Sequence, residues 1–236
     1  MSDWKAKRFW TAATVHPVEG GHTVRLDGRD VRTPLKTLTV MPTRALAEGV
    51  AAEWDAQEGL IDPLSMPLTR AVNATLDKVV PQRAEVAANL LEYGGTDLLC
   101  YRATGPARLA ARQAEAWDPL LDWADTALGA RLDVTEGVMY VAQPADAMEA
   151  LRTRIEAMTP WELTALSEFV TLSGSLIIAL RAMEGTDPDA LWPLSRVDET
   201  WQAEQWGEDA EEAERVARRR ADFVQAGRYL SLLRAD

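Results

Sequence analysis

Polar and apolar residues alternate with a period of two over the first forty residues, which is typical of β-strands. Residues 23–26 read Thr-Val-Arg-Leu, and the alternation resumes over residues 31–40. Asp27-Gly28 predicts a tight hairpin turn, because glycine easily adopts the positive φ that such turns need. Residues 19–21, Glu-Gly-Gly, predict a second turn. We therefore expect a small antiparallel sheet of short strands over residues 1–42.

The pattern then changes, and apolar residues recur every three or four positions, which predicts helices. Thr43 is a capping residue, and Gly59 can end the helix that begins there. A long helix is expected over residues 106–128. The chain is therefore expected to have an α+β fold, with a small antiparallel β domain over residues 1–42 and a larger, mostly helical domain over residues 43–236.

The strongest helix signal begins at Thr159. This capping residue is followed by a proline and then by Glu162, which completes a capping box. The apolar stripe that follows continues to Gly185, so we expect a single helix that contains the small residues Ser173-Gly174-Ser175. The internal glycine would then mark close packing against another element.

The remaining segments give weaker signals. A helix after Asp187 is expected to end at Gly207, and a final helix is expected over residues 208–227. Residues 132–134 and 138–141 are short apolar segments on either side of a Glu-Gly turn. They predict a second hairpin.

The charge of the chain limits its partners. The formal net charge is −12 over 236 residues, and an acidic protein is repelled by phosphate backbones, so nucleic-acid binding is not expected. No apolar run approaches the roughly 18 residues that a membrane span needs. The segment after Met1 resembles neither a secretory signal nor an import presequence. We expect a soluble protein that works in the compartment where it is synthesised.

Residue types that commonly carry catalysis are sparse. Cys100 lies in an apolar run, where burial is expected. His16 and His22 have no third ligand at a suitable spacing, so no metal site is expected. Asp118 and Asp122 place two carboxylates on one helix face, a spacing with which helical enzymes hold Mg²⁺ and a diphosphate. Such an enzyme is one alternative function; the other interpretation of this pair is a capping Asp118 beside an exposed Asp122.

The segment from Asp198 to Asp209 combines two tryptophans with five carboxylates. On a helix, Glu199, Gln202 and Trp206 share one face, because they are three and four residues apart. A carboxylate, an amide and an indole together suit recognition of another protein better than catalysis. The alternative is a helix with tryptophans in the core and solvated acids.

A second segment, residues 53–57, repeats this combination as Glu-Trp-Asp-Ala-Gln. Trp54 lies on the apolar stripe of its helix and is expected in the core. Asp55 and Gln57 are expected to be exposed at the end of that helix.

These and other motifs resemble the chaperones that assemble the catalytic head of the F-type ATP synthase and attend its α subunit. The mitochondrial members are called F(1) complex assembly factor 2. The matching motifs run through nearly the whole chain: Arg8-Phe9-Trp10, Leu26-Asp27-Gly28-Arg29, Arg32-Thr33-Pro34, Glu53-Trp54-Asp55 with Gln57, Ile61-Asp62-Pro63, Met66-Pro67-Leu68-Thr69, Thr96-Asp97-Leu98-Leu99, Tyr101-Arg102, Trp117-Asp118-Pro119, and Asp198-Glu199 with Gln202, Glu204, Trp206-Gly207 and Asp209.

The resemblance implies a chaperone, not an enzyme, that binds the unassembled α subunit and prevents its aggregation until it pairs with β. It implies no cofactor and no small-molecule substrate. It also implies that this chain is a bacterial member that works in the cytoplasm, whereas the eukaryotic relatives work in the mitochondrial matrix. The client-binding residues that it implies are Glu199, Gln202, Trp206, Glu204, Asp55 and Gln57, with structural roles for Trp54 and Gly207. An interaction domain with a different client is the remaining alternative.

Overall fold

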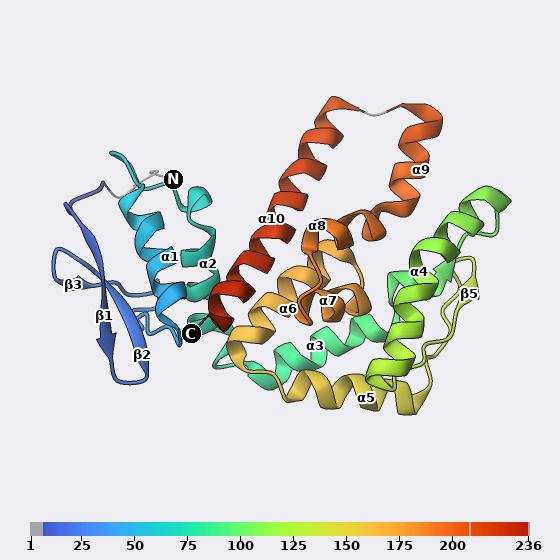
Figure 1. The fold of residues 1–236 in the computed structure, drawn as a ribbon, viewed down its shortest axis with the longest axis horizontal. Helices are drawn as coiled ribbons and strands as arrows, with labels where there is room; N and C mark the ends of the chain where they lie inside the picture. The colour runs from blue at the N-terminus through green and yellow to red at the C-terminus, as the bar shows by residue number, and fades with distance from the viewer. Residues whose placement is uncertain (1–6, 208, 236) are drawn as a thin grey trace. The chain divides into compact units, whose positions relative to one another are not determined.

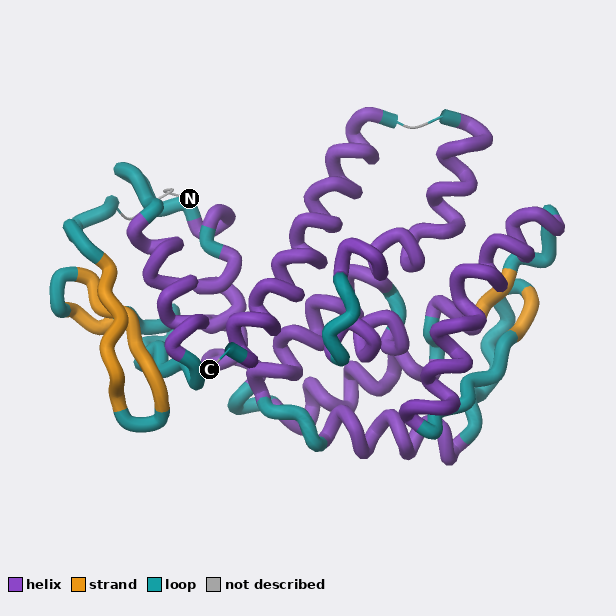
Figure 2. Tube along the Cα trace, viewed as in Figure 1, coloured by secondary structure: helices purple, strands orange, loops and turns teal. Residues whose placement is uncertain are grey.

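The computed structural model describes residues 7–207 and 209–235. It divides the chain into two compact units, the first containing residues 1–83 with 228–236 and the second containing residues 84–227. A small antiparallel sheet near the N-terminus is followed by helices (Figures 1 and 2), which confirms the expected α+β class. The change from strand to helix falls close to residue 42. The two compact units, in contrast, are defined by which residues contact one another. A domain boundary at residue 42 therefore stays a prediction.

The sheet consists of β1 (Ala13–Val18), β2 (Gly21–Leu26) and β3 (Arg29–Asp30), paired antiparallel in that order. Both expected turns are present. The turn between β2 and β3 is Asp27-Gly28, with φ of 47° and 84°, and positive φ at both positions matches the right-handed twist of the flanking strands. The expected sheet is therefore confirmed, although its third strand is shorter than the alternation indicates.

Helix α1 (Arg44–Asp55) packs on this sheet through its apolar face. The Thr43 hydroxyl accepts a hydrogen bond from the backbone N–H of Leu46 at 3.2 Å, as the capping position predicts. The helix ends at Asp55, so the prediction that it reaches Gly59 was wrong. Gly59 adopts a φ of 66° in the following turn, where its positive φ serves the loop instead of the helix end.

A buried carboxylate begins helix α2 (Pro67–Ala74). Glu53 of α1 accepts hydrogen bonds from the backbone N–H groups of Leu68 at 2.7 Å and Thr69 at 2.8 Å, and from the Thr69 hydroxyl at 2.8 Å. These bonds satisfy donors that a helix N-terminus leaves open, and the negative charge suits the helix dipole. The helix continues into a π-helical turn, Thr75–Val79.

The end of α10 (Ala210–Arg234) also belongs to the first unit. The Thr43 hydroxyl donates to the backbone oxygen of Leu232 at 2.8 Å. Thr43 therefore caps one helix and anchors the end of another, 189 residues away.

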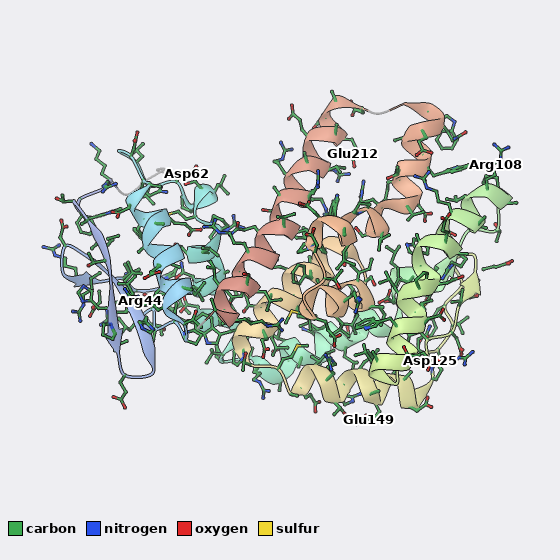
Figure 3. All side chains as sticks on the ribbon, viewed as in Figure 1. Arg44, Asp62, Arg108, Asp125, Glu149 and Glu212 are labelled. Atoms are coloured by element: carbon green, nitrogen blue, oxygen red, sulfur yellow. The ribbon has the colours of Figure 1, made fainter. Side chains whose placement is uncertain are left out.

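The second unit is helical. Its elements are α3 (Arg83–Gly95), α4 (Ala107–Leu128), α5 (Ala145–Glu156), α6 (Pro160–Ser173), α7 (Leu176–Met183), α8 (Pro188–Leu191), α9 (Val197–Trp206) and most of α10. The buried rings of Phe169 and Phe223 meet edge-on in its core, with centroids 4.9 Å apart. Charged side chains such as Arg108 and Glu149 lie on the outside of the helices (Figure 3). No helix in the part of the chain that the structure describes is long and apolar enough to cross a membrane.

The expected single helix over residues 160–185 is two helices, α6 and α7. Gly174 adopts a left-handed φ of 73° and ends α6, and the Ser175 hydroxyl caps α7 by accepting from the N–H of Ile178 at 3.0 Å. The prediction that the last helix ends at Gly227 was also wrong, because α10 continues through this glycine and ends at Arg234. A Cβ there would lie 2.4 Å from Pro188, so this glycine allows close packing and does not end the helix.

The expected hairpin over residues 132–141 is absent. β5 (Thr135–Glu136) instead pairs parallel with β4 (Tyr101–Arg102), a distant segment of the same unit. Residues 138–141 form no strand, and their apolar side chains are exposed. The apolar pattern at this position therefore does not report burial in a sheet.

Asp97 is a fully buried carboxylate in the second unit. It accepts hydrogen bonds from the backbone N–H groups of Leu99 and Ile177, both at 3.0 Å, and so connects the turn at Leu98–Cys100 to the start of α7. Burial raises the pKa of Asp97 to about 6, although these N–H donors oppose the shift. Cys100 is buried as expected.

Candidate functional site

Helix α9 exposes the polar and aromatic face that the spacing predicts. With a rotation of about 100° per residue, Glu199, Gln202 and Trp206 fall on one side and the buried Val197 falls on the other. Glu199 and Gln202 are exposed, and the Trp206 side chain is 80% exposed. We call these three residues the α9 stripe. An indole so far in water is not part of the core, which excludes the alternative interpretation for Trp206.

The opposite side of α9 is attached to α4, which lies beside it (Figure 1). Arg112 donates to both carboxylate oxygens of Glu204, at 2.9 and 2.7 Å, and this bond lowers the pKa of Glu204 below its ordinary value. The Gln113 amide donates to Asp198 at 2.6 Å. Glu204 therefore lies away from the stripe, and its contact orients the helix that presents the stripe.

The start of α9 is held in a third place. The buried Trp117 of α4 donates from its indole N–H to the backbone oxygen of Leu194 at 2.7 Å. The guanidinium of Arg102 lies 5.3 Å from the Trp117 ring centroid and reaches Asp118 at 2.7 Å. The stripe therefore projects from a helix with several fixed contacts in its own unit, which limits the conformational entropy that binding would cost.

One carboxylate of the pair in the alternative enzyme already has a partner. Asp118 faces Arg102, so a cation of the protein itself already neutralises it. α4 is continuous through Pro119, so the expectation that Asp118 caps a restarted helix was wrong. Within residues 7–207 and 209–235, no three His, Cys, Asp or Glu side chains are grouped as metal ligands would be.

Glu199 forms an ion pair within its own unit. Its carboxylate lies 2.9 Å from the guanidinium of Arg196, which also lies 3.6 Å from Glu212 at the start of α10. The Glu199 side chain is 48% exposed. Partly exposed ion pairs of this kind contribute only about 0–1 kcal/mol to stability. Glu199 is therefore available to a partner at little cost to the fold.

Gly207 ends α9 with a φ of 88°, a conformation that favours glycine. Its N–H donates to the backbone oxygen of Ala203 at 2.9 Å. The prediction that Gly207 closes this helix is confirmed.

The second predicted segment, residues 53–57, belongs to the first unit, whereas the α9 stripe belongs to the second. Trp54 is half-buried, not fully in the core as expected, because it lies in the last turn of α1. Its ring packs edge-on against that of Trp10, with centroids 5.2 Å apart. The guanidinium of Arg8 lies over the Trp10 ring, 5.4 Å from its centroid. Trp54 is thus one member of an aromatic pair that joins α1 to the chain before β1.

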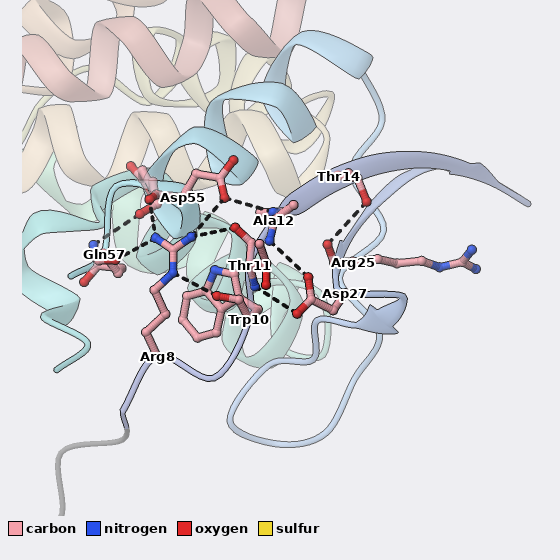
Figure 4. A network of polar contacts seen from close by, with 11 residues as sticks. Arg8, Trp10, Thr11, Ala12, Thr14, Arg25, Asp27, Asp55 and Gln57 are labelled. Atoms are coloured by element: carbon pink, nitrogen blue, oxygen red, sulfur yellow. Dashed lines mark hydrogen bonds and ion pairs between the residues drawn. The ribbon is translucent and has the colours of Figure 1, made fainter. Parts of the chain in front are cut away.

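Arg8 organises the polar contacts around this pair (Figure 4). It donates to the backbone oxygens of Asp55 at 2.5 Å and Gln57 at 2.8 Å, and to that of Thr11 at 2.9 Å. The Asp55 carboxylate accepts from the N–H of Ala13 at 2.9 Å and lies 3.6 Å from Arg8. Asp55 is exposed as expected, but its contacts join the end of α1 to β1.

Gln57 is buried, with 4% of its surface exposed, so the expectation that it is exposed was wrong. Its amide oxygen accepts from the N–H of Asp62 at 2.7 Å, and its amide nitrogen donates to the Ser65 hydroxyl and to the backbone of Glu53. The loop after α1 folds back over Gln57, which position in the helix alone does not indicate.

Comparison with known proteins gives concordant matches. The family model described as ATP12 chaperone protein matches residues 7–125. The crystal structure of Atp12 from Paracoccus denitrificans is 47% identical, has a TM-score of 0.94, and aligns over 98% of this chain and 100% of that chain. A protein of Agrobacterium tumefaciens described as a candidate chaperone is 44% identical, with a TM-score of 0.90 over 96% of this chain and 85% of its own. The mitochondrial protein atp12 of Schizosaccharomyces pombe is 25% identical over 221 residues, 87% of this chain and 76% of that protein.

Proposed function

Since the chain belongs to the ATP12 family of chaperones for ATP synthase assembly, we propose that its client is the unassembled α subunit of the F-type ATP synthase. The chaperone holds α until it pairs with β, and so prevents its aggregation. The motifs that resemble chaperones attending the α subunit support this choice of client. The cytoplasmic location expected from the sequence stays a prediction.

The observation that carries the proposal is the α9 stripe. A large indole exposed at 80% on a helix held by Arg112 and Gln113 is a preformed apolar anchor. Tryptophans in such positions commonly dominate the binding energy of an interface. In the proposed complex Trp206 enters an apolar pocket of the client, Gln202 donates or accepts hydrogen bonds, and Glu199 pairs with a basic group.

The other predicted client-binding residues act through structure in this proposal. Glu204 positions α9 through Arg112. Asp55 and Gln57 hold the end of α1 in the first unit. Direct contact of these three residues with a client stays a prediction.

We expect the tagged protein to recover the α subunit from a cell lysate, and to recover more of it when β is depleted, because β competes for α. Purified α and purified β, offered separately, provide the direct comparison. Recovery of β alone, or of neither subunit, would contradict the proposal, and recovery of an unrelated protein would favour an interaction domain with another client.

Replacing Glu199 with glutamine is expected to weaken protection of α by about 30-fold or more, because a buried charge that loses its partner in an interface costs roughly 2–5 kcal/mol. The melting temperature is expected to fall by no more than about 2–4 °C, since the Arg196 pair is worth at most about 1 kcal/mol. Light scattering of α diluted from denaturant measures the first quantity, and circular dichroism measures the second.

Glu214→Gln is the matched control, because this glutamate has a similar exposed ion pair, with Arg218, on α10. Equal protection by the wild type and the Glu199→Gln variant would mean that Glu199 is only a solvated charge. A large fall in melting temperature together with lost protection would instead assign it a structural role.

A further inference from the structure

Four consecutive apolar side chains are exposed in the second unit, outside the α9 stripe. Val138, Met139, Tyr140 and Val141 are 92%, 76%, 66% and 38% exposed. They lie in the loop between β5 and α5 (Figure 2), which we call the apolar loop. Single exposed apolar residues are common on protein surfaces, but a run of four on one short segment is typical of an interaction surface.

The ends of the apolar loop are fixed by the unit itself. The Gln143 side chain accepts from the N–H of Asp133 at 2.7 Å and donates to its backbone oxygen at 3.1 Å, as a paired strand residue would. On the other side, the N–H of Gly137 donates to the backbone oxygen of Arg102 at 2.8 Å, next to the β4–β5 pairing. The loop is therefore held at its base while its apolar side chains remain in water.

The backbone of the apolar loop is also available. Among the residues that the structure describes, the N–H and C=O groups of residues 138–141 have no backbone partner. Open backbone groups of this kind can pair with an extended segment of another chain, as in strand addition, in which the backbone provides affinity and alternate side chains provide specificity.

We propose that residues 138–141 form a second client-binding surface, which takes an extended apolar segment of the unassembled α subunit. Such a segment would be buried in the finished ATP synthase and exposed before assembly. This inference rests on the proposed chaperone function, and it names the chemistry of the client segment that the function leaves open.

The chemistry of the molecule disfavours a second copy of the chain as the occupant. Two copies would each carry a formal net charge of −12 and repel each other. Four side chains also provide far less than the roughly 800 Å² per partner that stable dimers bury. A short apolar strand of a client requires neither a large area nor charge complementarity.

The test replaces Val138 and Met139 with serine in the full chain. We expect about tenfold more of this double variant to be needed for half-maximal protection of the isolated α subunit, which corresponds to about 1.4 kcal/mol. The control is Leu35→Ser, at a 71% exposed leucine of the first unit, and it is expected to protect α as the wild type does. A photo-crosslinker in place of Met139 is expected to label an apolar segment of α.

The outcomes separate this inference from the proposed function. If the wild type fails to protect α, the proposed function fails. If the wild type and the double variant protect α equally, the inference is overturned and the proposed function stands. Crosslinking of Met139 to a second copy of the chain, or a clear fall in the melting temperature of the double variant, would also overturn the inference.

Discussion

Replacing Trp206 with alanine is expected to remove most of the client protection and to leave the fold intact. Truncating a central interface tryptophan commonly costs about 2–4 kcal/mol, which is a roughly 30- to 1000-fold weaker affinity. The same truncation changes little in the free protein, because the side chain is 80% exposed there. Protection of the isolated α subunit and the melting temperature, measured on the same preparation, give both quantities.

Two variants make this prediction specific. Trp206→Phe keeps an aromatic anchor and is expected to recover a large part of the protection. Leu64→Ala removes a side chain that is 79% exposed in the first unit, and it is expected to have no effect. If Trp206→Ala protects α as the wild type does, the indole is not an anchor. If Leu64→Ala loses as much protection as Trp206→Ala, the effect is not specific to Trp206, because any exposed apolar side chain could bind the client.

The sequence predicted the elements whose signals are local. The Thr43 cap, the Thr159–Glu162 capping box and the Asp27-Gly28 turn each depend on a few neighbouring residues, and all three are present. Glycines were harder to interpret, because one residue type serves two purposes. Gly174 ends a helix with a left-handed φ, whereas Gly227 stays helical and allows contact with Pro188, and the surrounding sequence does not distinguish these.

Helical spacing predicted the α9 stripe, but it did not predict the contacts that hold α9 in place. Glu204 and Asp198 are paired with residues of α4 that are 92 and 85 positions away in the chain. Such partners depend on how helices pack, and spacing within one helix carries no information about them. Gln57 was misjudged for the same reason, since its burial comes from a loop that folds back after the helix has ended.

Replacing Asp97 with alanine is expected to have the largest effect on stability. The change leaves the N–H groups of Leu99 and Ile177 buried without their acceptor and opens a small cavity at the start of α7. Unsatisfied buried donors cost about 1–3 kcal/mol each, so we expect a loss of roughly 3–5 kcal/mol and a fall in melting temperature of about 6–20 °C. Thermal unfolding at neutral pH measures this loss. A fall of less than about 3 °C would mean that water or a rearranged backbone replaces the carboxylate.

Asp97→Asn is the reference for the titration, because its side chain has nearly the same shape and does not titrate. Its amide nitrogen cannot accept from one of the two N–H groups that the carboxylate oxygens bind, and this loss does not depend on pH. The pKa of Asp97 is about 6 in the folded protein and 3.8 in its ordinary state, so the folded chain holds the proton more tightly. The stability that this proton provides is complete below a pH of about 3.8 and is lost as the pH rises through about 6. Relative to Asp97→Asn, the wild type should therefore lose up to about 3 kcal/mol across this interval. Other titrating groups are common to both proteins and cancel in the difference between their melting temperatures. That difference should favour the wild type most near pH 4 and narrow towards pH 7, whereas a constant or widening difference would show that the buried carboxyl is ionised throughout.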